Sequence, residues 1–389
     1  MRVRSHPWSG SLNSPFFYVY SSIVPRVGST ALGDAEVTRG FVAASVVLAV
    51  FCIGIHQGFG AVLVGETHYQ QPSARPASDT EKLKAEYRRP HTIQFPKDNP
   101  YTPEKATLGK ILYFDTRLSS GKVLSCATCH NPGFGWGDGL PKGVGHGMKK
   151  LGRRSPTVIN AAWGQIFFWD GRAASLEEQA LGPIQSEGEM NMPLGQLKER
   201  MAAIHEFKAL FDAAFPGEAM APVLMAKAIA TYERTVVSNP SPFDAWVAGQ
   251  ESAISDEAKR GFALFNGKAR CSSCHTNWTF TDGSFHDIRL PSEDIGRGKF
   301  LTGVVKMQHA FKTPGLREIT RRAPYMHDGS LLTLDAVIAH YDRGGEDRPS
   351  RSDLIKPLGL SAQEKSDLVA FLKTLTSDVD PTTVPVLPR

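Results

Sequence analysis

Three features are scarce or missing in this sequence of 389 residues, and each absence narrows the range of functions. There is no long run of Lys or Arg, and the formal net charge is only +5, so nucleic-acid binding is not indicated. Strand signals are few throughout, which favours a mainly α-helical fold. The most apolar segment, Phe41 to Ile55, is shorter than the roughly 20 residues that a membrane-spanning helix needs.

The N-terminal region is interpreted as a targeting segment followed by a linker. Arg39 precedes the apolar segment, a pattern typical of a secretory signal, so residues 1–65 are assigned to a signal peptide or to an uncleaved N-terminal anchor. Membrane contact is expected only through such an anchor. Cys52 lies within this segment and is given no role in the folded protein. The polar, proline-containing residues 66–94 are predicted to form a linker.

Cysteine is also scarce, yet four of the five cysteines fall into two copies of one motif. Both copies read C-x-x-C-H, which is typical of covalent haem attachment, with two thioethers and a His as axial ligand of the iron. The alternative is a zinc site built from two C-x-x-C pairs, but such pairs usually lie closer together and need no His after each. The sequence therefore predicts two covalently bound c-type haems, held by Cys126, Cys129, His130, Cys271, Cys274 and His275. Because bacteria attach this cofactor outside the cytoplasm, we expect the protein in the periplasm.

A similar helix is predicted before each motif. Thr102 is the expected N-cap of the first helix, and Ser255 is the expected N-cap of the second. Residues 108–113 match residues 260–265 locally, a weak internal repeat that duplication of one haem-carrying helical module would produce. A last helix, from Ser361 to Thr376, begins with a capping-box pattern.

The chain is too long for one ordinary hydrophobic core, so two domains are expected. The fold class is mainly α, with two cytochrome c-like haem domains packed together and few strands. We place an N-terminal haem domain at residues 95–245 and a C-terminal one at 246–389, because Pro240 and Pro242 interrupt the helical pattern near that boundary.

Further motifs resemble, in order and spacing, those of the bacterial dihaem cytochrome c peroxidases and their relative MauG. MauG is the dihaem enzyme that completes a tryptophan-derived quinone in methylamine dehydrogenase. The resemblance covers roughly residues 95–376. Besides the two C-x-x-C-H motifs, its landmarks are Gly145-His146-Gly147, Trp169-Asp170-Gly171-Arg172, Gln179, Glu189-Met190-Asn191 and Ala323-Pro324-Tyr325-Met326-His327.

The resemblance implies roles for individual residues. His130 would hold the haem that binds peroxide, and His275 would hold the haem that relays electrons. Glu189 would be the distal acid and base, with Gln179 bonding in the same pocket, and a carboxyl above an open iron site can move the proton that peroxide cleavage needs. Trp169 matches a tryptophan between the haems. Each of these three side chains alone would be an ordinary solvated or core residue, and their joint placement favours catalysis.

Tyr341 departs from the peroxidase pattern. Dihaem peroxidases usually have a Met there as the second ligand of the electron-transfer haem, whereas MauG has a Tyr. The alternative is core packing, because Tyr341 shares a helix face with other apolar residues. Met326 and Met307 are the fallback ligands. A phenolate ligand favours oxidised iron over easy reduction.

Two other positions concern metal ligands. His146 matches a His that can cap the peroxide haem in the peroxidases. Arg154 stands where the family usually has an Asn that helps bind calcium, together with the carbonyls of residues that correspond to Arg322 and Pro324. A guanidinium cannot coordinate a cation, so calcium is doubtful and Arg154 is a candidate to occupy its place.

Three functions follow from these residues. The first is a periplasmic dihaem peroxidase that reduces hydrogen peroxide with electrons from a small cytochrome c or a cupredoxin. The second is a MauG-like enzyme that uses peroxide equivalents to oxidise residues of a partner protein. The third, a dihaem electron carrier, needs no distal acid, so Glu189 and Gln179 argue against it.

Overall fold

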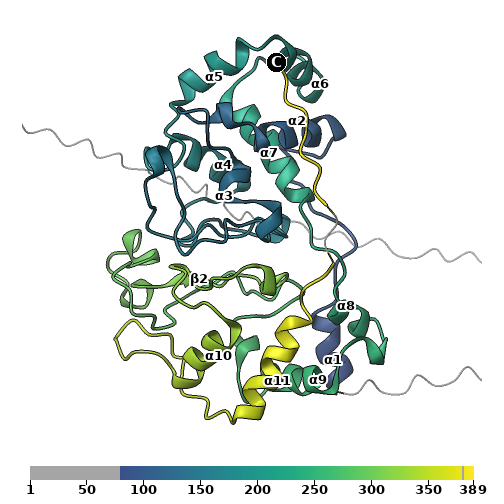
Figure 1. The fold of residues 1–389 in the computed structure, drawn as a ribbon, viewed down its shortest axis with the longest axis vertical. Coiled ribbons are helices and arrows are strands. Elements are labelled where there is room, and N and C mark those ends of the chain that lie inside the picture. The colour runs from purple at the N-terminus through teal and green to yellow at the C-terminus, as the bar shows by residue number, and fades with distance from the viewer. Residues whose placement is uncertain (1–78, 379–380) are drawn as a thin grey trace, which may run out of the picture. The chain divides into compact units, whose positions relative to one another are not determined.

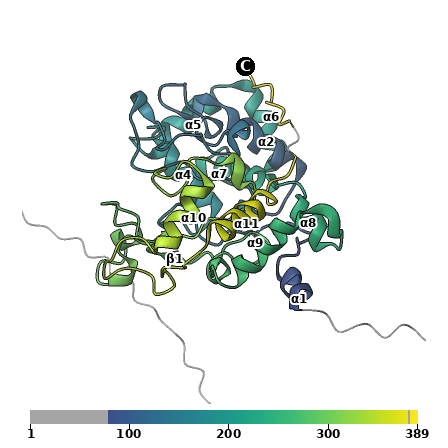
Figure 2. The same ribbon diagram turned by 60° about the horizontal axis from the view of Figure 1, so that its bottom comes forward.

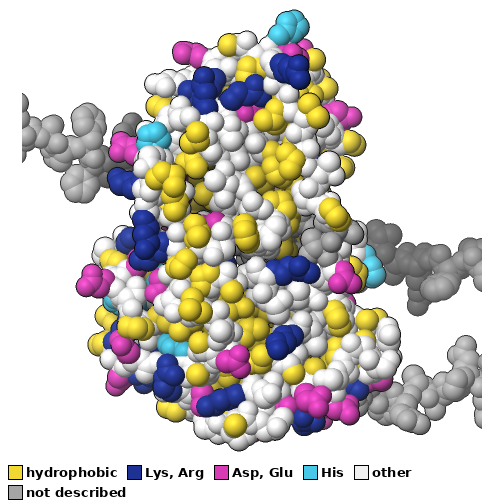
Figure 3. Space-filling model, viewed as in Figure 1, with side chains coloured by type: hydrophobic (Ala, Val, Ile, Leu, Met, Phe, Trp, Pro, Cys, Tyr) yellow, Lys and Arg dark blue, Asp and Glu magenta, His cyan; other side chains and the backbone are white. Residues whose placement is uncertain are grey.

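The computed structural model of the chain describes residues 79–378 and 381–389 (Figure 1). The targeting segment, Cys52 and the first part of the predicted linker lie outside the described residues. Within the described part, no helix is long and apolar enough to cross a membrane. On the face drawn in Figure 3, basic side chains are scattered among acidic ones, in line with the small net charge.

Helices dominate the described chain, so the predicted mainly α fold is confirmed. The α-helices are α1 (Asp79–Glu86), α2 (Pro103–Phe114), α3 (Cys126–Cys129), α4 (Leu176–Gln185), α5 (Leu194–Ala202), α6 (His205–Ala214), α7 (Pro222–Thr235), α8 (Pro242–Val247), α9 (Asp256–Asn266), α10 (Leu334–Arg343) and α11 (Ala362–Lys373). Single 3-10 turns are η1 (Thr116–Leu118), η2 (Pro132–Phe134), η3 (His146–Met148), η4 (Ala161–Trp163), η5 (Glu251–Ala253), η6 (Cys271–Ser273), η7 (Arg297–Lys299), η8 (Val305–Met307) and η9 (Ile319–Arg321). Strands β1 (Phe285–His286) and β2 (Phe311–Lys312) pair antiparallel, with Phe285 opposite Lys312.

Three of the predicted helix starts are confirmed by their caps. The hydroxyl of Thr102 accepts a hydrogen bond from Lys105 N at 3.2 Å at the start of α2. Ser255 caps α9 in the same way. Ser361 and Glu364 form the predicted capping box of α11, which ends at Lys373, slightly before the expected end.

Two hydrophobic cores organise these elements, and their helices form two separate groups in Figure 1. Figure 2 shows α9 and α11 of the second group side by side. The first core is built on α2 and α4 to α7. The second is built on α8 to α11. Val236 belongs to the first core and Phe243 to the second, so the change of core falls close to the predicted boundary.

The predicted linker is wrong for its described part, because Tyr87 and Leu83 pack in the second core. Tyr87 is fully buried, its ring stacks on Phe280 with centroids 4.8 Å apart, and its hydroxyl donates to Asn266 Oδ1 at 2.8 Å. Lys84 lies over the ring of Trp246 at 4.1 Å. The polar sequence of α1 concealed this contact, since Lys84 is the only buried residue of this helix.

The C-terminal tail also departs from the predicted domain assignment. Leu387 packs against the first core, and Arg117 donates to the carbonyl of Pro388 at 2.9 Å. Residues 381–389 therefore return to the N-terminal half, although the whole stretch 246–389 was assigned to the C-terminal domain. The short apolar segment around Leu387 carries no periodic pattern from which its partner could be predicted.

The internal repeat has a structural basis in two close helix crossings. Gly109 of α2 lies against α7, where an added Cβ would be 1.9 Å from the carbonyl oxygen of Ala228. Gly261 of α9 lies against α11, where an added Cβ would be 2.0 Å from the carbonyl oxygen of Asp367. Each half therefore places the helix before its C-x-x-C-H motif by the same backbone contact.

We expect Gly261→Ala to lower the free energy of unfolding by about 2–3 kcal/mol, because α9 and α11 would have to move apart. Gly195→Ala is the control. Gly195 lies in α5 with nothing within 4 Å of an added Cβ, so we expect a gain of about 0.5–1 kcal/mol there. Thermal unfolding of the two variants would check this, and equal midpoints would contradict the close-contact explanation.

Candidate functional site

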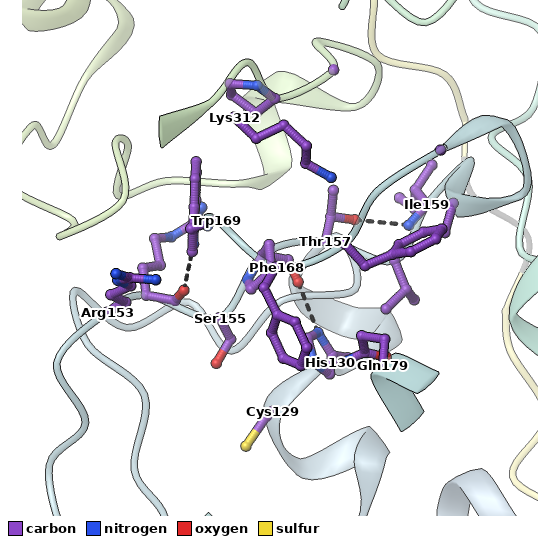
Figure 4. A pocket seen from close by; sticks show the side chains of 18 of the residues that line it. Cys129, His130, Arg153, Ser155, Thr157, Ile159, Phe168, Trp169, Gln179 and Lys312 are labelled. Carbon is purple, nitrogen blue, oxygen red and sulfur yellow. Dashed lines mark hydrogen bonds between the residues drawn. The ribbon is translucent and has the colours of Figure 1, made fainter. Parts of the chain in front are cut away.

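A cavity of about 1080 Å³ lies between the two halves (Figure 4). One side of its wall comes from residues 124–190 and Ile229 and Glu233 of α7. The other side comes from residues 277–326. The cavity wall contains Cys126, Cys129, His130, Trp169, Gln179 and Glu189, so it brings together most of the residues predicted for the peroxide site.

The first C-x-x-C-H motif is held in the form that a haem ligand requires. The cysteines begin and end α3, whose start is fixed by a capping box between Ser125 and Thr128. His130 Nδ1 lies 2.7 Å from the carbonyl oxygen of Pro156, which fixes the proton on Nδ1 and leaves Nε2 to bind a metal. Burial lowers the pKa of His130, so its imidazole is neutral.

The second motif repeats this arrangement. Cys271 begins η6, and His275 N donates to the carbonyl oxygen of Cys271 at 2.9 Å. The corresponding bond in the first motif, from His130 N to Cys126 O, measures 2.8 Å. His275 Nδ1 lies 2.9 Å from the carbonyl oxygen of Phe280, and burial lowers the pKa of this histidine too. Both motifs thus present a neutral imidazole with Nε2 available.

The zinc alternative does not fit the arrangement of the cysteines. Among the described residues, the one group with metal-ligand spacing is Cys274, Asp282 and His286, so the two cysteine pairs do not converge. Two separate C-x-x-C-H motifs, each with a tautomer-fixed His, fit two haems instead.

Gln179 and Glu189 line the same cavity as His130, and Gln179 and His130 are both labelled in Figure 4. Gln179 lies on α4, and Glu189 lies in the turn after this helix, with its backbone N bonded to Ser186 O at 3.0 Å. Besides burial, the charge of Glu189 contributes to the raised pKa of Cys129, so the carboxyl is close to the first motif.

His146 is packed beside the Glu189 turn, but its ring contacts a different residue. His146 N donates to Glu189 O at 2.7 Å, while His146 Nδ1 lies 3.2 Å from Ser120 Oγ. Gly145 allows this close approach, since a Cβ there would be 1.9 Å from the carbonyl oxygen of Gly188. Gly145 lines the cavity and the His146 side chain does not. The role of His146 as an iron ligand stays a prediction.

Trp169 connects the two halves. Its Nε1 donates to the carbonyl oxygen of Arg154 at 2.9 Å, and its own carbonyl accepts from Lys312 N of β2 at 2.8 Å. Arg297 donates to the carbonyls of Asp170 and Gly171 at 2.9 and 2.6 Å. The turn that begins at Trp169 is therefore held by residues from both sides of the interface, which agrees with a position between two haems.

An ion-pair network beside Trp169 was not predicted from the sequence. The guanidinium of Arg153 forms ion pairs with two carboxylates, that of Asp170 at 2.5 Å and that of Asp294 in the other half at 2.6 Å. Burial alone would raise the pKa of Asp294, but the Arg153 guanidinium holds this pKa well below its ordinary value. Asp170 belongs to a recognised landmark, yet nothing in the sequence near Asp294 indicates that it lies opposite Arg153.

Arg154 is buried, and its guanidinium donates to the carbonyl oxygen of Arg322. This carbonyl is one of the two that the resemblance assigns to calcium. A cationic side chain of the protein itself thus contacts one predicted calcium ligand. That Arg154 occupies the place of calcium stays a prediction.

Tyr341 lies on α10, with Leu334 and Ile338 of the same helix in the second core. Burial raises the pKa of Tyr341, and the charges of Cys271 and Cys274 raise it further, so the phenol is close to the second motif. No hydrogen bond to its hydroxyl is found among the described residues, which leaves the oxygen available as a ligand. Of the fallback residues, Met326 lines the cavity and Met307 ends η8.

Comparison with known proteins gives consistent matches. The model of the di-haem cytochrome c peroxidase family matches residues 103–252, and the cytochrome c model matches residues 258–376. The chain is 53% identical to the methylamine utilization protein MauG of Methylorubrum extorquens, over 80% of this chain and 89% of that protein. It is 47% identical to the MauG protein of Methylophilus methylotrophus, over 78% and 91%. A solved MauG-like protein associated with microbial copper homeostasis has a TM-score of 0.69 and 31% identity, over 75% of this chain and 94% of that one.

Proposed function

We propose, from the premise that the chain belongs to the family of di-haem cytochrome c peroxidases and MauG proteins, that it uses peroxide equivalents to oxidise residues of a partner protein. As a member of this family, the protein is an oxidoreductase with two covalently bound c-type haems. The observation that carries the finer proposal is Tyr341, which lies half-buried beside the second C-x-x-C-H motif.

Each haem would be held by two cysteines and one histidine of its motif, with His130 and His275 as axial ligands. Haem, when bound, supplies the iron redox chemistry that reduces peroxide. Glu189 would carry a proton from one peroxide oxygen to the other, because it lies in the cavity with His130. Gln179 would orient peroxide from α4. Trp169, bonded to both halves, would lose an electron and so share the oxidising equivalents.

A tyrosine at position 341 suits oxidation of a protein better than turnover with a small donor. A thioether ligand favours ferrous iron and so eases electron entry, whereas an anionic oxygen ligand favours ferric iron. An enzyme that must wait for a large substrate gains from retaining its oxidising equivalents. The names of two relatives, both methylamine utilization proteins, support the same assignment.

The proposed partner is therefore a protein whose tryptophan residues are oxidised to a quinone, as in methylamine dehydrogenase. Hydrogen peroxide is the proposed oxidant. Attachment of c-type haem takes place outside the bacterial cytoplasm, so we assign the enzyme and its partner to the periplasm. A small cytochrome c or a cupredoxin as electron donor is the competing possibility that experiment has to separate.

In the test, the holoprotein and hydrogen peroxide are mixed with each of two substrates in separate reactions. One is methylamine dehydrogenase in which the tryptophan-derived quinone is incomplete, and the other is a reduced small cytochrome c. We expect quinone absorbance and the matching mass change in the first reaction, and slow oxidation in the second. Reactions without peroxide or without the holoprotein are the controls. Rapid cytochrome oxidation with an unchanged dehydrogenase would make the protein an ordinary peroxidase.

A further inference from the structure

Three cationic side chains in the cavity wall have no carboxylate partner. Arg154 and Arg322 are 7% and 6% exposed, and Lys312 is largely buried on β2. Arg154 donates to the carbonyl of Arg322, and Arg322 to the carbonyl of Gly315. Lys312 Nζ donates to the carbonyl of Ile166 at 2.7 Å. Among the described residues, none of the three forms an ion pair with an Asp or Glu.

Several other buried cations of the chain are neutralised, including two more in the cavity wall. Arg153 pairs with Asp170 and Asp294. Arg317 pairs with Asp244 at 2.8 Å. Outside the wall, Arg234 of α7 pairs with Glu177 at 2.6 Å. Within the cavity wall, the lack of an ion-pair partner is therefore particular to Arg154, Arg322 and Lys312, which we call the cation trio.

The acidic groups around the trio are engaged elsewhere or uncharged. The negative charge of Asp138 acts to raise the pKa of Arg154, but the Asp138 carboxylate accepts a hydrogen bond from Ser155 Oγ at 2.7 Å. The negative charge of Glu318 acts to raise the pKa of Arg322, but the Glu318 carboxylate accepts a hydrogen bond from Ser377 Oγ. Glu233 also lines the cavity, and burial raises its pKa to about 8, which keeps it protonated at neutral pH.

Burial without a counter-ion is unfavourable for all three cations. Burial lowers the pKa of Lys312 to about 8. Burial together with the positive charge of Arg154 lowers the pKa of Arg322 to about 10. The Nε atoms of Arg154 and Arg322 lack any acceptor. A cavity with this wall favours an anion with several acceptor oxygens, and guanidinium groups bind carboxylates in particular.

We propose that the cation trio binds the propionate carboxylates of the haem held by the first motif, at the interface between the halves. Thioethers to Cys126 and Cys129 would hold the vinyl-bearing edge of the first porphyrin, so its propionates would lie at a different edge. The cavity continues from these cysteines to the trio. Arg154 belongs to the N-terminal half, whereas Arg322 and Lys312 belong to the C-terminal half. The site therefore joins the halves through the cofactor, and it rests on haem content rather than on the identity of the partner protein.

Two substitutions test the proposal in the holoprotein. Arg154→Gln and Lys312→Met each remove one positive charge, and each should shift the propionate bending band in the resonance Raman spectrum. Each should also lower the midpoint potential of a haem, since a nearby cation favours the ferrous state. We expect about a tenfold change in the ferric-to-ferrous equilibrium, which is about 59 mV for one electron. Arg154→Lys, which retains the charge, should restore most of the potential.

Lys208→Gln is the control, because Lys208 is a 77% exposed cation on α6 and should move neither readout. The measurements are repeated with and without inorganic phosphate. If the wild-type potentials follow the phosphate concentration and Arg154→Gln removes that response, the trio binds free phosphate and the proposal is wrong. It is equally wrong if both variants keep two haems with unchanged Raman bands and potentials. Should Arg154→Gln fail to fold, Lys312→Met decides alone.

Discussion

Glu189→Gln is expected to slow the reaction of the protein with hydrogen peroxide by on the order of 10²-fold or more, the usual scale of general acid–base catalysis. The carboxyl of Glu189 lines the cavity together with His130, and its charge contributes to the raised pKa of Cys129 in the first motif. An amide retains the size of the side chain but cannot accept and return a proton. Stopped-flow absorbance after mixing with peroxide measures the rate, and both haem spectra before mixing should be intact.

Glu187→Gln is the matched control for this experiment. Glu187 lies in the same turn but is exposed, and it is absent from the cavity wall. We expect the Glu187 variant to react with peroxide at the rate of the unmodified protein. If Glu189→Gln also reacts at that rate, the carboxyl does not carry the proton and the assignment fails.

Tyr341→Met should change the kind of reaction that the protein performs. A thioether at this position would raise the potential of the C-terminal haem, because it favours ferrous iron. We expect oxidation of the partner protein to fall at least about tenfold and turnover with a small cytochrome c to rise, as the oxidising equivalents are lost more readily. Tyr341→Phe should leave an open or water-ligated iron with an altered spin state. Both results can be read by electron paramagnetic resonance and by the two substrate assays described above.

Tyr232→Phe provides the control for the tyrosine variants. The pKa of Tyr232 is likewise raised by burial, but this tyrosine belongs to α7 and to the first core. Its replacement should leave the spectrum of the C-terminal haem unchanged. A Tyr341→Phe protein with the same spin state and potential as the unmodified protein would identify Tyr341 as core packing.

Local signals in the sequence were sufficient for three helix starts and for the haem motifs. The caps at Thr102, Ser255 and Ser361 depend on residues within one turn, and all three are confirmed. The helical fold class follows from the same kind of pattern. The glycine contacts of Gly109 and Gly261 explain why the weak repeat was visible, since a backbone crossing tolerates no other side chain.

Contacts between distant segments could not be predicted in this way. The burial of Tyr87 against Phe280 and the return of Leu387 to the first core involve single side chains without periodicity. The bond between Arg153 and Asp294 requires the two halves to be placed against each other, which no local pattern specifies. These are also the contacts that fix the domain limits and the interface.

The candidate site was predicted by resemblance more than by residue chemistry. Glu189, Gln179 and Trp169 are each ordinary in isolation, and the structure places all three in the cavity wall with His130. The ring of His146 lies against Ser120, a detail that depends on how its loop packs on the Glu189 turn. The cation trio was missed because an unpaired charge is recognised only once its surroundings are known.

The most direct test of the central claim is the near-infrared absorption spectrum of the ferric wild-type protein. If Tyr341 ligates the C-terminal iron, the spectrum lacks the charge-transfer band of methionine-ligated ferric haem, and Tyr341→Met creates that band. If the wild-type protein already shows the band, then Met326 or Met307 is the ligand. In that case Tyr341 is a packing residue, and the proposal of a MauG-like enzyme loses the observation that carries it.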